Sequence, residues 1–368
     1  MKIAILSMQR VVNFGSVLQA WSLRELIREG TGAEVCFLDI EDMPALPSRK
    51  TVAETVDYEV PADYPPGIFQ KVKRRCITML SAHNKRLIRK FMEEELALEE
   101  TNRYTYLDAV VVGSDEVFNH AKGIRLQLHG QVGQTGKVIA YGASCGSALP
   151  EDIAPEDRPR VAEAMSRFRG MSVRDAATEA YVRELYTGAI DRHLDPVLVG
   201  ELYKRCHRPV CLKKYLLVYA YGQRIRTREE ISAIREYARA RGLKTVAVGG
   251  SQFWCDLYVP ATPFRLLDYF YYADCVVTDT FHGAIFSVVN RKRFAVIPRQ
   301  TNRNKLSSLL EDLGLQAQML PDISCLETVI SREIDYDRVE RILQTERART
   351  RAYLREQLGG TDEANQTL

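Results

Sequence analysis

Short apolar runs alternate with longer helical patterns along both halves of the chain, and this alternation constrains the fold most. Apolar, β-branched segments that predict strands lie at 2–7, 34–40, 108–113, 137–143, 171–174, 215–221, 244–248, 275–278 and 293–297. Segments with helical spacing lie at 16–29, 155–169, 175–185, 228–241, 263–273, 281–290 and 305–313. Strands that alternate with helices favour parallel sheets covered by helices. We therefore expect an α/β fold with two doubly wound, mainly parallel sheets that face one another across a cleft.

The length of 368 residues exceeds what a single hydrophobic core usually holds, so two domains are expected. We predict an N-terminal Rossmann-like domain at 1–200, with a loop-and-helix insertion at 41–100, and a C-terminal Rossmann-like domain at 201–335. Residues 201–214 are expected to form the hinge. A charged helix at 336–358 is expected to pack back on the first domain.

The composition indicates a globular protein, since 46% of the residues are hydrophobic and 27% are charged. A formal net charge of +3, without a zinc-finger, RNP or helix-turn-helix signature, predicts no nucleic-acid partner. The eight cysteines are scattered without a Cys-x-x-Cys pair, which favours reduced thiols and predicts no metal site. The first residues lack a signal-peptide pattern, and no apolar run is long enough to span a bilayer. We therefore expect a cytoplasmic protein.

The insertion combines a proline-rich, acidic segment at 41–66, which predicts a mobile loop or lid, with a long helix expected at 68–98. The apolar positions expected on the packed side of this helix are Phe69, Val72, Cys76, Leu80, Leu87 and Phe91. Between 68 and 92 the charged positions are all basic: Lys71, Lys73, Arg74, Arg75, Lys85, Arg86, Arg89 and Lys90. Such a helix suits peripheral contact with an anionic membrane, at the inner membrane face, or with a polyanionic acceptor. The alternative is the solvated side of a packed helix.

One strand-turn-helix unit places a histidine where α/β sheets bind ligands. The runs at 275–278 and 281–289 predict a buried strand and a helix. Asp279 and Thr280 between them favour helix N-caps, which puts His282 in the first helical turn. The helix dipole and the free amides favour an anion at this point, where an imidazole can donate to a phosphate or transfer a proton. The alternative is a histidine that caps local backbone.

Two loops in the first half also follow predicted strands. After the first strand, Asn13 or Ser16 can cap a helix, while Gly15 lets the backbone approach a ligand closely. After the third strand, the adjacent acids Asp115 and Glu116 can orient a sugar or accept a hydroxyl proton. The alternative is that Ser114 or Asp115 only caps the next helix.

Further candidates for anion binding follow other strands. Arg174 can hold a carboxylate bidentately, although a structural pair with Asp175 or Asp195 is the rival interpretation. Gly249 and Gly250 end a strand with a glycine pair suited to phosphate contact. Arg303 and Lys305 lie at a strand-to-helix junction and match an anionic ligand shared with the histidine. A solvated basic loop is the alternative there.

The order of these segments is more specific than any one of them. Along the chain come Asn-Phe-Gly-Ser-x-Leu-Gln, Val-Gly-Ser-Asp-Glu-x-Phe-Asn, Tyr-Gly-Ala-Ser, Ser-Val-Arg-Asp, Leu-Asp-Pro, Thr-Asp-Thr-Phe-His-Gly and Asn-x-Lys-Leu-x-x-Leu-Leu. In this order they resemble the polysaccharide pyruvyl transferase family, over a span from about Asn13 to Leu315.

The resemblance implies a fold similar to the two-Rossmann, GT-B type of glycosyltransferase. It also implies an activity: transfer of the enolpyruvyl group of phosphoenolpyruvate onto two hydroxyls of a sugar, in a surface polysaccharide or its precursor, with or without a lipid link. This chemistry requires no metal or cofactor. The rival hypotheses are a GT-B glycosyltransferase that uses a nucleotide sugar and a non-catalytic sugar-binding relative.

The resemblance also implies roles for particular residues. His282 is expected beside phosphoenolpyruvate as phosphate ligand or acid, while Arg174, Arg303 and Lys305 offer charge to its carboxylate and phosphate. Lys305 stands where the family usually has arginine, so the fork geometry is lost and a point charge is kept.

On the acceptor side the resemblance implies that Asp115 or Glu116 is the base or orienting group. The usual family signature has glutamine in place of Glu116 and tryptophan in place of Phe118. Phe118 is expected to reshape an aromatic platform on which a sugar stacks.

Overall fold

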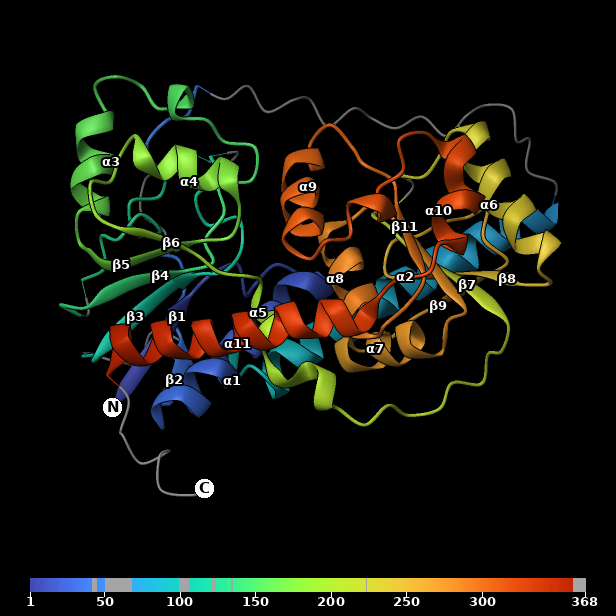
Figure 1. The fold of residues 1–368 in the computed structure, drawn as a ribbon, viewed down its shortest axis with the longest axis horizontal. Coiled ribbons are helices and arrows are strands. Elements are labelled where there is room, and N and C mark those ends of the chain that lie inside the picture. Colours follow the sequence, from blue (N-terminus) through green and yellow to red (C-terminus); the bar gives the residue numbers. More distant parts are fainter. Residues whose placement is uncertain are drawn as a thin grey trace.

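The computed structural model describes residues 1–41, 45–49, 68–98, 106–120, 123–133, 135–222 and 224–359. The strands are β1 (Lys2–Leu6), β2 (Glu34–Phe37), β3 (Ala109–Gly113), β4 (Val138–Tyr141), β5 (Phe168–Val173), β6 (Ile190–Arg192), β7 (Tyr215–Tyr219), β8 (Lys244–Val248), β9 (Leu257–Val259), β10 (Cys275–Thr278) and β11 (Phe294–Val296). They form two sheets, in the orders β2-β1-β3-β4-β5-β6 and β11-β10-β7-β8-β9, and every neighbouring pair is parallel. The predicted α/β architecture of two Rossmann-like sheets is confirmed (Figure 1).

The α-helices are α1 (Phe14–Thr31), α2 (Ile68–Glu94), α3 (Arg158–Met165), α4 (Ala176–Arg183), α5 (Pro196–Val199), α6 (Arg228–Ala240), α7 (Pro263–Tyr272), α8 (Phe281–Val289), α9 (Arg303–Asp312), α10 (Leu326–Ser331) and α11 (Tyr336–Leu358). Most of them match the predicted helices within a few residues. Four short elements were not predicted from the sequence, β6, β9, α5 and α10, because elements of three to six residues are too short to show a periodicity.

Each sheet has one point at which the strand order reverses. In the first sheet the chain leaves β1 for β2 on one side and returns to β3 on the other side. In the second sheet it passes from β7 through β8 to β9 and then returns to β10 on the other side of β7. Ligands of open α/β sheets bind at the carboxyl ends of the strands that flank such a point. The strand order therefore predicts that a ligand binds near the loops after β1, β3, β7 and β10.

Helix α2 precedes β3 in the chain but packs on the second sheet. Its Ile77 belongs to the apolar core around β7 and β8, and its Asn84 Oδ1 accepts a hydrogen bond of 2.8 Å from the Ala261 amide. The predicted packed side is wrong for Val72 and Cys76, which are exposed. The buried stripe consists of Ile77, Asn84, Ile88 and Phe91, at helical spacing. Apart from 41 and 45–49, the loop predicted at 41–66 lies outside the described residues.

Helix α11 connects the two halves along one side of the molecule, running from the second sheet back to the first (Figure 1). Near its start the Tyr336 hydroxyl donates to the Lys292 carbonyl, which precedes β11. Toward its end the Tyr353 hydroxyl donates to the Ala140 carbonyl of β4 at 2.8 Å. These bonds tie both sheets to one helix.

Candidate functional site

The loop after β10 and the start of α8 form the centre of the candidate site. Thr280 is the N-cap of α8, and its hydroxyl accepts a hydrogen bond of 2.9 Å from the Gly283 amide. His282 is the second residue of the helix, as the sequence predicted. A Cβ at position 283 would lie 2.0 Å from Thr278 Oγ1, so only glycine lets the turn pack this tightly.

The His282 ring lies between two groups of the first half of the chain. Its Nε2 lies 3.6 Å from Asp195 Oδ2, and it makes no hydrogen bond with any described residue. On the other side, a Cβ added to Gly15 would lie 2.3 Å from His282 Nδ1. The absent side chain of Gly15 therefore makes room for the imidazole itself, and the predicted contact of Gly15 with a ligand stays a prediction.

Asp195 organises the buried centre of the site. Its carboxylate accepts hydrogen bonds from Gln19 Nε2 at 2.7 Å, from Arg174 Nη1 at 3.1 Å and from the Val197 amide at 3.0 Å. Burial alone would raise the pKa of Asp195, but His282, Arg174 and the Val197 amide outweigh it and hold the pKa below its usual value. Asp195 is therefore a buried carboxylate that stays charged.

Arg174 has the structural pair that its rival interpretation foresaw, because it binds Asp195. Its guanidinium also lies over the Phe281 ring, 4.3 Å from the centroid, while its buried Nε has no hydrogen-bond partner among the described residues. The sequence analysis noted Asp195 only as a possible partner of Arg174. The Leu-Asp-Pro motif was the signal that pointed to it.

The loops after β1 and β3 lie against each other at the reversal point of the first sheet. Asn13 is the N-cap of α1, and its side chain accepts from the amides of Gly15 and Ser16. The Ser16 hydroxyl donates to Asp115 Oδ2 at 2.8 Å. Asp115 does not cap a helix, because no helix follows β3 directly; its Oδ1 accepts from the Glu116 amide instead. Of the cap residues predicted in these two loops, Asn13 is the one that caps a helix.

Glu116 forms an ion pair across the two halves. Its Oε1 accepts from Lys305 Nζ at 2.5 Å, and its Oε2 accepts from Asn119 Nδ2 at 2.7 Å. Burial would raise the pKa of Glu116, but the charge and hydrogen bond of Lys305, helped by Asn119 and Arg174, lower it to about 2. The structure therefore brings together two residues that the sequence placed in different roles.

Arg303 and Lys305 lie in the first turn of α9 but differ in their surroundings. Lys305 is half-buried and lies 5.9 Å from the centroid of the Phe281 ring, so Phe281 has cations from both halves of the chain beside it. Arg303 is exposed, and no ion pair joins it to another described residue. Its predicted contact with an anion stays a prediction.

Gly249 and Gly250 end β8 in positions that packing explains. Gly249 has a φ of +88°, and a Cβ at Gly250 would lie 2.0 Å from the Ala220 carbonyl oxygen. Gly250 lets the loop after β8 pack against the loop after β7, and Gly249 leaves room for the rings of Tyr219 and Phe14. This is a structural reason for the pair, and phosphate contact stays a prediction.

Phe118 does not form an aromatic platform for a sugar, so this expectation is wrong. The side chain is fully buried, and its ring lies 5.1 Å from the His129 ring and 6.2 Å from the Tyr181 ring, measured between centroids. An aromatic residue after β3 completes the first core instead. The exposed aromatic residue near the site is Tyr221, after β7.

A second polar cluster, which the sequence analysis missed, lies beside the loop after β10. Arg299 Nη1 donates to Glu230 at 2.5 Å, and Asp279 Oδ2 lies 3.3 Å from Arg299 Nε and 3.6 Å from Arg224 Nε. Burial raises the pKa of Asp279 despite the two arginines. These residues lie far apart in the sequence, so no local motif could predict the cluster.

Neither metal nor thiol chemistry is suggested by the described part of the chain. No group of three or more His, Cys, Asp or Glu side chains there is arranged to hold a metal ion. Cys145 is buried, and burial raises its pKa to about 11, so its thiol stays protonated at neutral pH. No helix among the described residues has the length and apolarity that crossing a bilayer requires.

The two parallel sheets, with a histidine and cations gathered at their carboxyl edges, define a two-domain, Rossmann-like α/β protein. The chain belongs to the polysaccharide pyruvyl transferase family, whose model matches residues 13–301, and it is therefore a transferase. No curated protein is significantly similar to it in sequence.

Solved structures resemble the chain only distantly. The UDP-GlcNAc 2-epimerase of Methanocaldococcus jannaschii, solved with UDP-GlcNAc and UDP, is 11% identical with a TM-score of 0.49, over 94% of this chain and 99% of that one. The glycosyltransferase SsfS6 of Streptomyces sp. SF2575, complexed with thymidine diphosphate, is 15% identical with a TM-score of 0.48, over 97% and 99%. SnogD of Streptomyces nogalater, also a glycosyltransferase, is 13% identical with a TM-score of 0.46, over 97% and 99%. At these values the ligands of those enzymes imply nothing about this chain.

Proposed function

We propose that the protein transfers the enolpyruvyl group of phosphoenolpyruvate onto two hydroxyls of a carbohydrate, in a surface polysaccharide or its precursor. The family membership supports pyruvyl transfer. The observation that carries the assignment to this site is the gathering of Arg174, His282 and Lys305 around Phe281 at the N-terminus of α8. The charges of Arg174 and Lys305, the imidazole of His282 and the dipole of α8 together match a small molecule that carries both a carboxylate and a phosphate.

The reaction needs acid, base and charge neutralisation but no redox step. A proton adds to the methylene carbon of phosphoenolpyruvate, and one sugar hydroxyl attacks the adjacent carbon. The bond from that carbon to the phosphate oxygen then breaks, and a second hydroxyl closes the ketal ring. Two O–H bonds are lost and two C–O bonds form; one proton stays on the new methyl group and one leaves with phosphate. The proposal requires neither a metal nor a cofactor.

The residues divide between donor and acceptor. His282 is the acid or phosphate ligand, and Arg174, Arg303 and Lys305 hold the donor's anionic groups. Because Lys305 is bound to Glu116 in this structure, it must exchange that partner to reach a phosphate. Release from Lys305 would leave Glu116, beside Asp115, as the base or orienting group for the acceptor.

Phosphate release from phosphoenolpyruvate, measured against a panel of galactosides, mannosides and glucuronides, tests the proposal. His282→Ala is expected to lower turnover by about 10²–10⁴-fold, the usual contribution of a general acid. His83→Ala, at an exposed histidine of α2, is the matched control and should keep wild-type turnover. Near-normal turnover of His282→Ala would refute the assigned role. A melting temperature raised by UDP- or GDP-sugars but not by phosphoenolpyruvate would refute the donor.

We further propose that the enzyme works in the cytoplasm and contacts the inner membrane face, where a lipid-linked acceptor would lie. The support is the outer face of α2, on which Val72 and Met79 are 56% and 66% exposed. At 100° per residue they share this face with the exposed cations Arg75 and Arg86. Apolar side chains among cations match an anionic bilayer surface.

Co-sedimentation with vesicles tests this contact. Vesicles with 30% anionic lipid (about the charge of a bacterial inner leaflet) should retain the wild-type protein, and neutral vesicles should not. The double variant Val72→Asp/Met79→Asp should lose binding. Leu149→Asp, at a 58% exposed leucine outside α2, is the control and should bind normally. Equal sedimentation of all three proteins would overturn the proposal.

A further inference from the structure

Tyr221 is an exposed aromatic residue at the reversal point of the second sheet. It follows β7 by two residues, and 50% of its surface is open to solvent. The exposed Tyr271, by contrast, lies at the end of α7, which leads to the amino end of β10. Tyr221 is therefore at the edge of the sheet where α/β proteins bind ligands, and Tyr271 is at the opposite edge.

The backbone of Tyr221 is held firmly from three directions. Its carbonyl accepts hydrogen bonds from Gln252 Nε2 at 2.8 Å and from the Arg224 amide at 3.1 Å. A Cβ at Gly250 would lie 2.7 Å from the Tyr221 carbonyl carbon, so the neighbouring loop supports the backbone closely. An exposed ring on such a fixed backbone loses little freedom on binding a ligand.

The end of β7 meets the first half of the chain. Tyr219, two residues before Tyr221, packs on Phe14 of α1 with ring centroids 6.4 Å apart, and Ser16 in the same helical turn bonds Asp115 at 2.8 Å. Burial and the carboxylates of Asp115 and Glu116 raise the pKa of Tyr221 to about 12, so the hydroxyl is neutral and can donate a hydrogen bond. The Arg224 guanidinium lies 5.4 Å from the ring centroid.

We propose that Tyr221 is the platform on which the acceptor sugar stacks, so that its hydroxyls reach Asp115. This inference rests on the proposed function and deepens it by naming the acceptor subsite. The flat ring suits the apolar C–H face of a pyranose, and the carboxylate of Asp115 retains lone pairs beyond those used by Ser16 and the Glu116 amide. The aromatic platform for the sugar is therefore Tyr221, which follows β7. The sequence had suggested Phe118, which follows β3.

The proposed positions for the acceptor and the donor follow different strands. The donor's cations Arg174 and Lys305 lie against Phe281, whereas Tyr221 follows the neighbouring strand β7. A planar nucleotide base is the other ligand that would stack on an exposed tyrosine. The nucleotide therefore has its own arm in the experiment.

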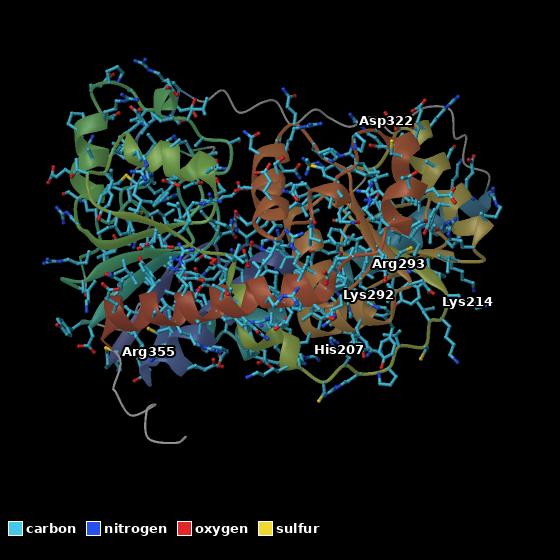
Figure 2. All side chains as sticks on the ribbon, in the orientation of Figure 1. His207, Lys214, Lys292, Arg293, Asp322 and Arg355 are labelled. Atoms are coloured by element: carbon cyan, nitrogen blue, oxygen red, sulfur yellow. The ribbon has the colours of Figure 1, made fainter. Side chains whose placement is uncertain are left out.

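The experiment compares Tyr221→Ala, Tyr221→Phe and Tyr221→Trp with Tyr271→Ala. Tyr271 is 45% exposed and stacks on His207, which Figure 2 labels near α7. Turnover gives KM for each substrate, and saturation-transfer NMR with methyl galactoside, methyl mannoside and methyl glucuronide detects acceptor binding without turnover. A melting-temperature shift reports binding of phosphoenolpyruvate and of UDP.

Tyr221→Ala is expected to raise the acceptor KM, or the dissociation constant, by about 10-fold or more, as loss of an aromatic stacking partner does. The KM for phosphoenolpyruvate should change less than about twofold. Tyr221→Phe and Tyr221→Trp, which keep a ring, should stay within about threefold of the wild type, and Tyr271→Ala should match it.

Several outcomes would overturn the proposal. These are an unchanged acceptor KM or NMR signal in Tyr221→Ala, an equal loss of phosphoenolpyruvate binding, no saturation transfer from the wild type to any sugar, and a UDP-induced shift that Tyr221→Ala abolishes. If the wild type binds a sugar through Tyr221 but releases no phosphate from phosphoenolpyruvate, the proposed function fails while the subsite stands.

Discussion

Two contacts that join the halves of the chain, Asp195 beside His282 and the Arg192–Asp312 ion pair, differ mainly in depth. Asp195, which faces His282, is fully buried, whereas Arg192 and Asp312 keep 35% and 33% of their side-chain surface. Asp195 has three hydrogen-bond donors arranged around it, but Arg192 uses a single nitrogen, Nη2, for both Asp312 oxygens. A charge removed from water depends on its partners for stability, while a surface charge retains solvent as a substitute. The buried pair therefore belongs to the site, and the surface pair only joins the two halves.

The Glu116–Lys305 pair is intermediate, with 31% and 18% of the side-chain surfaces exposed. It also lies beside the site, since Lys305 Nζ is 5.9 Å from the centroid of the Phe281 ring. This gradient of burial predicts a gradient of effects, which the following variants test.

The largest effect is expected at Asp195. Asp195→Ala leaves Arg174 buried without its carboxylate, which should reduce the free energy of unfolding by about 3–5 kcal/mol. Urea denaturation measures the change. Asp191→Ala, at an exposed aspartate of β6, is the control and should remain within about 0.5 kcal/mol of the wild type. If Asp195→Ala reduced the free energy of unfolding by less than about 1 kcal/mol, burial would not determine how strongly each pair stabilises the protein.

The next effect is steric. Gly15→Ala brings a Cβ against the His282 ring and should cost about 1–3 kcal/mol and most of the turnover. Gly30→Ala in the same helix has no atom within 4 Å of the new Cβ and should stabilise by about 0.5–1 kcal/mol. In Gly15→Ala/His282→Ala the stability should recover, since the colliding ring is gone. Without recovery, the collision is not with His282.

A smaller, pH-dependent effect is expected at Glu116. Because its folded-state pKa is lowered to about 2, its ion pair stabilises the protein fully above the unfolded pKa of about 4.3. That stability is lost as the pH falls from about 5 to 2, since the unfolded state takes up the proton first. Lys305→Met should reduce the free energy of unfolding at pH 7 by about 1.5 kcal/mol and flatten the curve in this window. Urea denaturation from pH 2.5 to 7 measures the free energy of unfolding of the wild type, Lys305→Met and Glu116→Gln. If its pH dependence in Lys305→Met equalled that of the wild type, Lys305 would not be the group that lowers the pKa of Glu116.

The smallest effect is expected at the surface pair. A double-mutant cycle with Arg192→Ala and Asp312→Asn should give a coupling of about 0.5 kcal/mol. The coupling should fall further in about 1 M salt, where surface charges are screened. A coupling above about 2 kcal/mol would show that this exposed pair stabilises the protein as much as a buried one, contrary to the expected dependence on burial.

Local patterns predicted most of the elements and half of the site. The cap at Thr280 and the position of His282 follow from residues within four positions of each other, so the sequence alone locates them. The capping role of Asn13 follows in the same way. The packed side of α2 did not, because its apolar residues lie on two faces and only the second sheet decides which is covered.

The alternation of strands and helices, the helix start at His282 and the family could all be predicted from the amino-acid sequence. These depend on side chains a few positions apart, whose spacing along the chain is also their spacing in space. Three other features required the three-dimensional arrangement: Gly15 faces His282, Glu116 binds Lys305, and Tyr221 is exposed whereas Phe118 is buried. Those neighbours come from different strands, and the order of strands in a sheet, which sets them side by side, is a property of the whole fold.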